Sequence, residues 1–110
     1  MVNNSLQDSL TKVKELDYAN GRQVKYQDTG TEMSYTFTQS GLAILSADRS
    51  SFGATDAIFS INNIQLGLQY LGFEYCRFCM SFLVSNGDVA SIELNVNTKC
   101  IKTITFIPYK

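Results

Sequence analysis

Two cysteines three residues apart, Cys76 and Cys79 in the stretch FEYCRFCM, have the spacing found in zinc knuckles and redox centres. That chemistry needs both thiols on one side of a turn or helix start. Here the residues around them alternate between large apolar and smaller or polar types, which predicts a strand with the two thiols on opposite faces. A zinc site wants four ligands, and the chain has 3 cysteines and no histidine. The sequence therefore predicts no metal site and no cofactor.

The third cysteine, Cys100, is expected on the same face as Cys76 but two strands away. Two interstrand steps are about 9 to 10 Å, which is beyond the reach of a disulfide. We therefore interpret the three thiols as core-packing side chains. Three unpaired thiols also favour a reducing compartment, and we expect the protein to be cytoplasmic.

The residue types of the chain exclude the common catalytic pairs and leave only carboxylates as candidates. The absence of histidine excludes Ser-His and Cys-His nucleophile pairs, so an enzyme would have to work with carboxylates. The candidates are Asp48, Asp56, Glu74 and Glu93, and no two of them have a telling spacing. No glycine-rich phosphate loop is present. The sequence predicts no catalytic residue and a protein that is not an enzyme.

The length, composition and net charge of the chain limit the classes of partner that we expect. The 110 residues predict one domain, 1–110, with 45% hydrophobic and 17% charged residues, as in globular proteins. A net charge of −1 and scattered basic residues disfavour nucleic acid. No apolar run is long enough to span a bilayer, and the first residues lack the features of a secretory signal. We expect a soluble chain that binds neither nucleic acid nor membrane.

The first two thirds of the chain predict two helices and three short strands. Apolar residues at helical spacing predict an amphipathic helix over residues 5–19. Alternation over 24–27 and 33–38 around the turn at 28–30 predicts a hairpin, and 42–45 a third strand followed by a loop to Gly53. Residues 60–71 fit a helical stripe, while Ile64 to Tyr70 also fit a strand. We choose the helix, although Gly67 argues against it.

The last forty residues predict a three-stranded meander over 73–84, 89–97 and 100–107. Even-numbered residues in all three strands are expected to face the core. A three-residue loop, Ser85-Asn86-Gly87, with Gly87 in the left-handed conformation would then pair Phe82 with Ala90 and Cys76 with Val96.

These elements predict an α+β fold: an N-terminal helix packed on an antiparallel sheet of five or six strands, and a second helix before the C-terminal meander. As an architecture this is similar to cystatin-like and NTF2-like domains, in which a curved sheet wraps a helix. The similarity concerns architecture alone, because no motif of either family is present.

The functional hypothesis follows from the mixed odd-numbered face of the last strands. Its residues Tyr75, Arg77, Glu93 and Asn95 are types able to anchor a protein contact. We expect a small non-enzymatic module that inhibits or neutralises a protein partner, of the immunity, antitoxin or anti-defence type. One alternative is a ligand-binding or catalytic pocket with Glu74 or Tyr35. The other is a structural subunit that self-associates, as a homodimer or larger assembly, through a strand edge.

Overall fold

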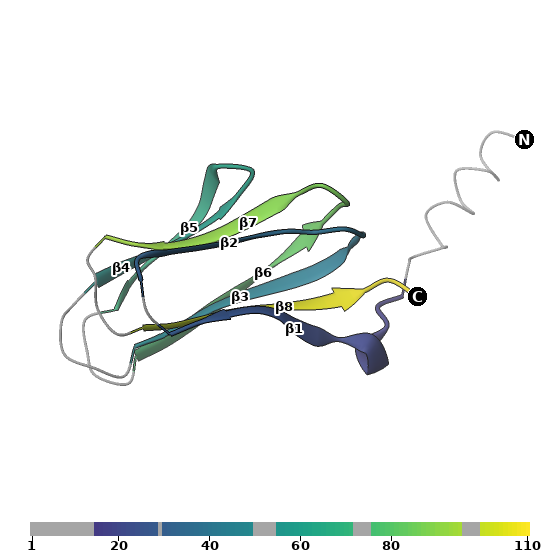
Figure 1. Cartoon of the computed structure of the whole chain (residues 1–110), viewed down its shortest axis with the longest axis horizontal. Helices are drawn as coiled ribbons and strands as arrows, with labels where there is room; N and C mark the ends of the chain where they lie inside the picture. The colour runs from purple at the N-terminus through teal and green to yellow at the C-terminus, as the bar shows by residue number, and fades with distance from the viewer. Residues whose placement is uncertain (1–14, 29, 50–54, 72–75, 96–99) are drawn as a thin grey trace, which may run out of the picture.

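The computed structural model describes residues 15–28, 30–49, 55–71, 76–95 and 100–110. Its eight strands form two antiparallel sheets stacked as a sandwich (Figure 1). The strands are β1 (Arg22–Gln27), β2 (Glu32–Thr36), β3 (Gly41–Arg49), β4 (Thr55–Ile61), β5 (Ile64–Leu71), β6 (Cys76–Val84), β7 (Val89–Leu94) and β8 (Cys100–Pro108), and a short 3-10 turn, η1 (Tyr18–Asn20), precedes them.

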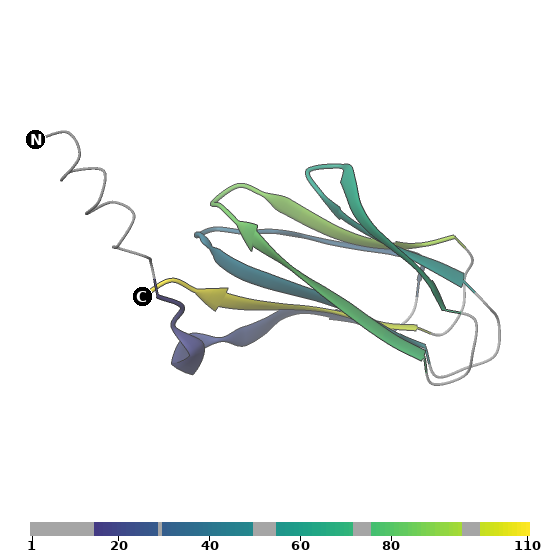
Figure 2. The same ribbon diagram turned by 180° about the vertical axis from the view of Figure 1, so that it is seen from behind.

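Strand order shows how the chain passes between the two layers. One sheet runs β1-β8-β3-β6 and the other β2-β7-β4-β5. Among the described strands, β4 and β5 are the one consecutive pair in the same sheet, and every other connection crosses to the opposite layer (Figure 2). This order is that of a jelly roll. Its edge strands are β1 and β6 in one sheet and β2 and β5 in the other.

The core fills the space between the layers with side chains from alternate positions of the strands. In β3 the odd residues Ala43, Leu45 and Ala47 are buried, and in β8 the even residues Ile104 and Phe106. The other large buried side chains are Met33, Phe37, Phe59, Leu71, Ile92 and Leu94. In β3 and β7, and in β8 as far as Phe106, this alternation gives each strand one buried face and one more exposed face.

The predicted α+β class is wrong, because the described residues are almost entirely β and contain no helix of seven or more residues. Residues 1–14 of the expected 5–19 helix lie outside the described residues. The remainder is not helical: Leu16 forms an isolated bridge with Tyr109, and η1 is a single 3-10 turn. The expected 60–71 helix is the β4–β5 hairpin. No long, apolar helix that could cross a bilayer occurs in the part of the chain described.

The predicted pairings of neighbouring strands are also wrong. β1 pairs with β8 and β2 with β7, so the expected hairpin over 24–38 does not form. β6 pairs with β3, whereas β7 pairs with β2 and β4, so Phe82 and Ala90 lie in different sheets. Their even-numbered residues nevertheless both face the interior, because the inner faces of the two layers look at each other. Gly87 has the predicted left-handed conformation (φ 94°), in a turn that connects the layers.

The face prediction itself is confirmed. Ala90, Ile92 and Leu94 in β7 and Ile104 and Phe106 in β8 are buried, and Phe78, Met80 and Phe82 of β6 pack against the same core. The third strand is longer than predicted. β3 runs from Gly41 to Arg49, so it extends beyond the predicted 42–45 strand into the segment that was expected to be a loop. It is the central strand between β6 and β8.

Candidate functional site

Strand β5 carries the most exposed run of large apolar side chains among the described residues. Ile64, Leu66, Leu68 and Tyr70 are 63%, 48%, 55% and 61% exposed. We call these four residues the β5 strip. Leu68 and Tyr70 pair with Ile58 and Asp56 on the outer face of the sheet, whereas Ile64 pairs with buried Ile61 and Leu66 is the extra residue at a register shift. Because β5 ends the strand order of its sheet, the strip lies beside a backbone edge that pairs with no other described strand. Isolated apolar side chains are normal on surfaces, but four exposed ones on a single edge strand make β5 the candidate contact surface.

The hairpin that creates the strip depends on two asparagines. Asn62 and Asn63 both have positive φ, 52° and 64°, as two-residue type I′ turns require. Asparagine is one of the few residues other than glycine that adopt this conformation at low cost. Ile61 then pairs with Ile64, and a register shift between Phe59 and Ser60 accommodates one extra residue of β5. The local sequence thus specifies a hairpin where helical spacing suggested a helix.

A hydrogen-bond network fixes this turn to the β6–β7 connection. The Asn62 amide donates to Asp88 Oδ1 (3.0 Å), and Asn62 Oδ1 accepts from the backbone of Val89 (2.9 Å). Asp88 Oδ2 accepts from the backbone N–H of Ser85 (2.8 Å). The Asn62 bond, and then the Ser85 bond, lower the pKa of the Asp88 carboxyl below its ordinary value. The charged form of Asp88 therefore stabilises this end of the sandwich.

Substitution of Asp88 by Asn should lower stability at pH 7 and remove part of the acid sensitivity. Because the folded-state pKa is lowered, the stabilisation is present above about pH 4 and is lost as the pH falls through the folded-state value. Urea unfolding of wild type and D88N at pH 7 and pH 3 should show midpoints that differ at pH 7 and differ less at pH 3. A gap of the same size at both pH values would contradict this account.

Gly67 brings β5 close to the opposite layer. It lies on the inner side of β5, and a Cβ at this position would collide with Sδ of Met80 on β6. Phe59 of β4 lies 3.6 Å from the same point. Met80 therefore occupies the space above a residue without a side chain, and Gly67 allows β5 to approach β6 closely.

The outer face changes from apolar to acidic across the sheet. Leu68 pairs with Ile58 of β4, which pairs with Glu93 of β7, which pairs with Glu32 of β2. These four residues form one row perpendicular to the strands. The two glutamates are exposed and directly opposed, an arrangement that is mildly unfavourable in isolation. Two like charges thus share this row with Leu68, Glu93 two strands away from β5 and Glu32 three strands away.

The sequence-predicted partner residues do not share one face. Arg77 lies on the outer face of β6, in the sheet opposite Glu93 and Asn95. This corrects the premise of the prediction, and the physical reason is that β6 and β7 belong to different layers. Tyr75 lies outside the described residues. Their role in partner binding stays a prediction.

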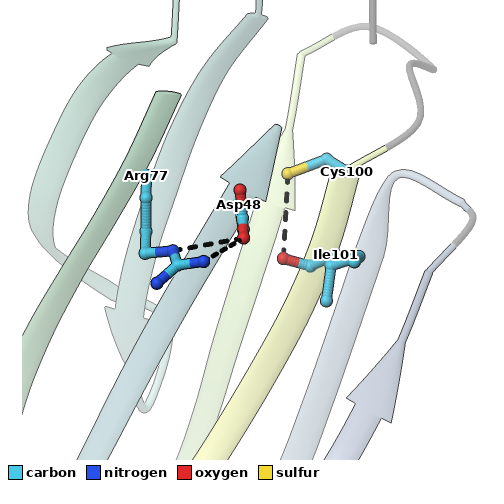
Figure 3. Close-up of polar contacts among 4 residues, drawn as sticks. All are labelled: Asp48, Arg77, Cys100 and Ile101. Atoms are coloured by element: carbon cyan, nitrogen blue, oxygen red, sulfur yellow. Dashed lines mark hydrogen bonds and ion pairs between the residues drawn. The ribbon is translucent and has the colours of Figure 1, made fainter. Parts of the chain in front are cut away.

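Arg77 forms a cross-strand ion pair. Its Nε and Nη2 both donate to Asp48 Oδ2, at 3.1 and 2.8 Å, from the neighbouring strand β3 (Figure 3). The side chain of Arg77 is 74% exposed and that of Asp48 26%. Such a surface pair contributes about 1 kcal/mol or less, so sheet registration explains the contact adequately.

Asn95 connects β7 to the start of β4. Its Oδ1 accepts from the backbone N–H of Asp56 (2.9 Å), and its amide donates to Asp56 Oδ2 (3.1 Å). Asn95 therefore has a structural role, because its side chain connects the end of β7 to β4. Asp56 pairs in turn with Tyr70 of β5, and Glu93 lies in the same row as Leu68 through Ile58, so Asn95 and Glu93 both lie two strands from β5 on its sheet.

The cysteines lie as strand geometry requires where they are described. Cys79 is exposed on the outer face of β6, and Cys100 is buried on the inner face of β8, with Sγ 4.0 Å from the carbonyl oxygen of Ile101 (Figure 3). The backbones of Cys76 and Cys100 pair with opposite sides of Arg49 in β3. The predicted separation of two strands is therefore confirmed, although β3 and not the 89–97 strand lies between them.

Residues of the predicted pocket alternative are accounted for by packing where they are described. Tyr35 contacts Phe37 edge-on, with ring centroids 5.0 Å apart, and lies against the core. Glu74 lies outside the described residues.

Comparisons with known proteins add little to this geometry. No protein-family model and no curated protein matches the sequence. Two solved structures are similar. One is a β-glucosidase from Paenibacillus barengoltzii (12% identity, TM-score 0.48, 82% of this chain and 10% of that chain), and the other a GH26-CBM35 β-(1,4)-mannanase from Podospora anserina (14%, 0.49, 88% and 26%). The chain spans a small part of each, and the similarity is too low to support a function. The proposals below rest on this chain's own residues.

Lys102 is a buried charged residue that the sequence did not single out as a candidate. It is fully buried, at an even position of β8 between Cys100 and Ile104. Its Nζ donates to the carbonyl oxygens of Gly30 (2.9 Å) and Cys100 (3.3 Å). Burial lowers the pKa of its ammonium, and interactions with Cys100 and Asp28 oppose that shift. The prediction that even-numbered residues of 100–107 face the core includes position 102, and this signal could have identified Lys102 as a buried charge.

Proposed function

We propose that this chain is a non-enzymatic protein-binding module whose β5 strip contacts an extended, apolar segment of a protein partner. The supporting observation is the exposure of four large apolar side chains on one edge strand. An extended partner segment can add to a sheet edge through main-chain hydrogen bonds, while alternate side chains provide specificity. The sequence-based alternative of a self-associating strand edge uses this same surface.

The composition of β5 supports this role. Edge strands are usually protected from association by charged residues, proline or marked irregularity. The strand IQLGLQYL contains no charge and no proline, and its one irregularity is the register shift at Leu66. Burial of one exposed leucine stabilises a complex by about 1.5 to 3 kcal/mol, so two or three such contacts are enough for a specific interaction.

The acidic end of the row indicates the partner's charge. Glu93 and Glu32 lie on the same outer face as Leu68, so a basic group in the partner would relieve their mutual repulsion. We propose a partner that combines apolar residues with a nearby lysine or arginine. Neutralisation of such a partner in the cytoplasm, as by immunity proteins and antitoxins, is the biological role that we favour.

Leu68→Lys tests this function, with Leu83→Lys as its matched control. Leu83 is 70% exposed on β6, an edge strand of the other sheet, so both substitutions place a charge at an exposed leucine. The immobilised wild-type chain should capture a protein from source-cell extract in stoichiometric amount. L68K should recover at least about tenfold less and L83K an equal amount. Circular dichroism checks that both variants are folded.

Two results would contradict the proposed function. One is equal recovery of the partner by L68K and wild type. The other is equal loss in both variants, because general charge effects rather than the β5 strip would then explain the loss.

A further inference from the structure

Two asparagines of the chain are followed directly by glycine, in Asn20-Gly21 and Asn86-Gly87, and both pairs are exposed. An Asn-Gly pair is prone to spontaneous deamidation, because glycine has no side chain to hinder attack by its own backbone nitrogen on the asparagine side chain. The attack requires both residues to rotate until that nitrogen reaches the side-chain carbon Cγ. The contacts around each pair therefore decide how fast it reacts in the folded protein.

The first pair is restrained through its side chain, its backbone and its packing. The side-chain amide of Asn20 donates to Asp17 Oδ2, at the end of the 3-10 turn η1. The Gly21 N–H donates to the carbonyl oxygen of Tyr18 (3.1 Å), and a Cβ at Gly21 would lie 3.2 Å from Cγ1 of Ile107. Asn20 and Gly21 can rotate toward each other only after the bonds to Asp17 and Tyr18 have broken.

The second pair is restrained through its backbone alone. Among the described residues, no hydrogen bond holds the side chain of Asn86, which is exposed in the β6–β7 turn. A Cβ at Gly87 would meet no atom within 4 Å, so the space around the glycine is open. One contact opposes the reaction, because the Gly87 N–H donates to the carbonyl oxygen of Phe37 (2.8 Å). That bond must open before the nitrogen can attack, and surface turns open locally at a lower free-energy cost than central strands.

We propose that Asn86 is a site of spontaneous deamidation in the folded protein and that it reacts faster than Asn20. The backbone nitrogen of Gly87 forms a bond to Cγ of Asn86, the side-chain carbon–nitrogen bond breaks, and ammonia leaves with the proton of the attacking N–H. Water then opens the resulting succinimide ring at either of its carbonyl groups. The product is aspartate or isoaspartate at position 86, and both carry an added negative charge. This inference goes beyond the proposed function and does not depend on it.

The modification would weaken the turn that connects the two layers. The succinimide has no N–H at residue 87, so the bond to the carbonyl oxygen of Phe37 is lost while the ring is present. Isoaspartate lengthens the main chain of the turn by a methylene group, which displaces the residues that follow. The new carboxylate also lies two residues from Asp88, whose charged side chain holds Asn62, and like charges repel. We therefore expect the modified protein to be less stable than the unmodified chain.

Peptide mapping by mass spectrometry measures the reaction at both pairs in one sample. The wild-type chain is incubated at mildly alkaline pH, once folded and once in concentrated urea, and the rate of deamidation at each asparagine in the folded chain is divided by its rate in urea. This ratio removes the effect of neighbouring sequence and leaves the effect of the fold. The ratio should be at least about fivefold higher for Asn86 than for Asn20. Asn86→Gln, whose longer side chain forms the ring far more slowly, should stop the reaction at position 86 and leave that at Asn20 unchanged.

Urea unfolding of the separated products provides the second readout. Asn86→Asp carries the added charge on a main chain of normal length, so it is the matched control for protein that contains isoaspartate at position 86. The unfolding midpoint should be highest for the unmodified chain, lower for N86D and lowest for the isoaspartate form. Equal ratios at Asn20 and Asn86, faster reaction at Asn20, or no reaction at Asn86 in the folded chain overturns the inference. An isoaspartate form as stable as the unmodified chain overturns the predicted weakening of the turn.

Discussion

Gly41→Ala should destabilise the protein by about 3 kcal/mol, the largest loss expected from adding one methyl group to this chain. Gly41 begins the central strand β3 and pairs with Val84 on one side and Pro108 on the other. A Cβ here would collide with the backbone carbonyl oxygen of Ile107 and lie 2.8 Å from two ring atoms of Phe106. The carbonyl belongs to a strand of the same sheet, so relief requires movement of β3 away from β8. Urea unfolding measures the loss.

Gly87→Ala is the matched control. Gly87 has φ 94°, and a Cβ there meets no atom within 4 Å. The expected loss is about 1 kcal/mol and comes from the left-handed backbone alone. Equal losses in the two variants would show that close packing at Gly41 is not the decisive factor.

The sequence predicted which side of each strand is buried, and this part of the fold is confirmed for the C-terminal strands. Alternation of residue types reflects the environment of each side chain, and Ala90, Ile92 and Ile104 are buried as expected. Alternation carries no information on which sheet a strand joins. In a sandwich, β6 and β7 can both face inward from opposite layers, which satisfies the same pattern as a hairpin. The choice between them depends on long-range pairing that no local pattern encodes.

The choice of a helix over 60–71 illustrates a second limit. Apolar residues in this segment satisfy both helical and strand spacing, because the outer face of β5 is itself apolar. A strand with one polar face would have been recognised. Three local signals favoured the strand: Asn62, Asn63 and Gly67 all suit the hairpin and not a helix interior. The property that makes β5 a candidate binding surface is therefore the one that obscured it.

The candidate site was partly predictable for the same reason. Glu93 was selected as a partner residue and lies in the row that contains Leu68. Arg77 was selected with it, since a hairpin between their strands would have placed both on one face. The β5 strip could be read as a surface only after the strand order showed that β5 is an edge.

Lys102→Ala should destabilise the protein by about 3 kcal/mol, from the cavity left by a fully buried side chain and from the loss of its bonds to two carbonyl oxygens. The Gly30 bond connects β8 to the β1–β2 connection, so this loss should also loosen that connection. Lys102→Met keeps the unbranched chain and should lose less. Urea unfolding at pH 7 ranks the three proteins.

The pH dependence separates the charge of Lys102 from its packing. Burial lowers the pKa of the folded-state ammonium, so above that pKa the unfolded state binds more protons than the folded state. Stability due to this group must therefore rise with pH from the lowered value up to about pH 10.4, the pKa of an exposed lysine. The free energy of unfolding of wild type should gain on that of K102M as the pH is raised from 7 to 10, while other titrating groups affect both proteins alike. Parallel curves would show that the two carbonyl partners stabilise the buried ammonium as well as water does, and a wild type that falls relative to K102M would show that they stabilise it better; either result contradicts the expected lowering.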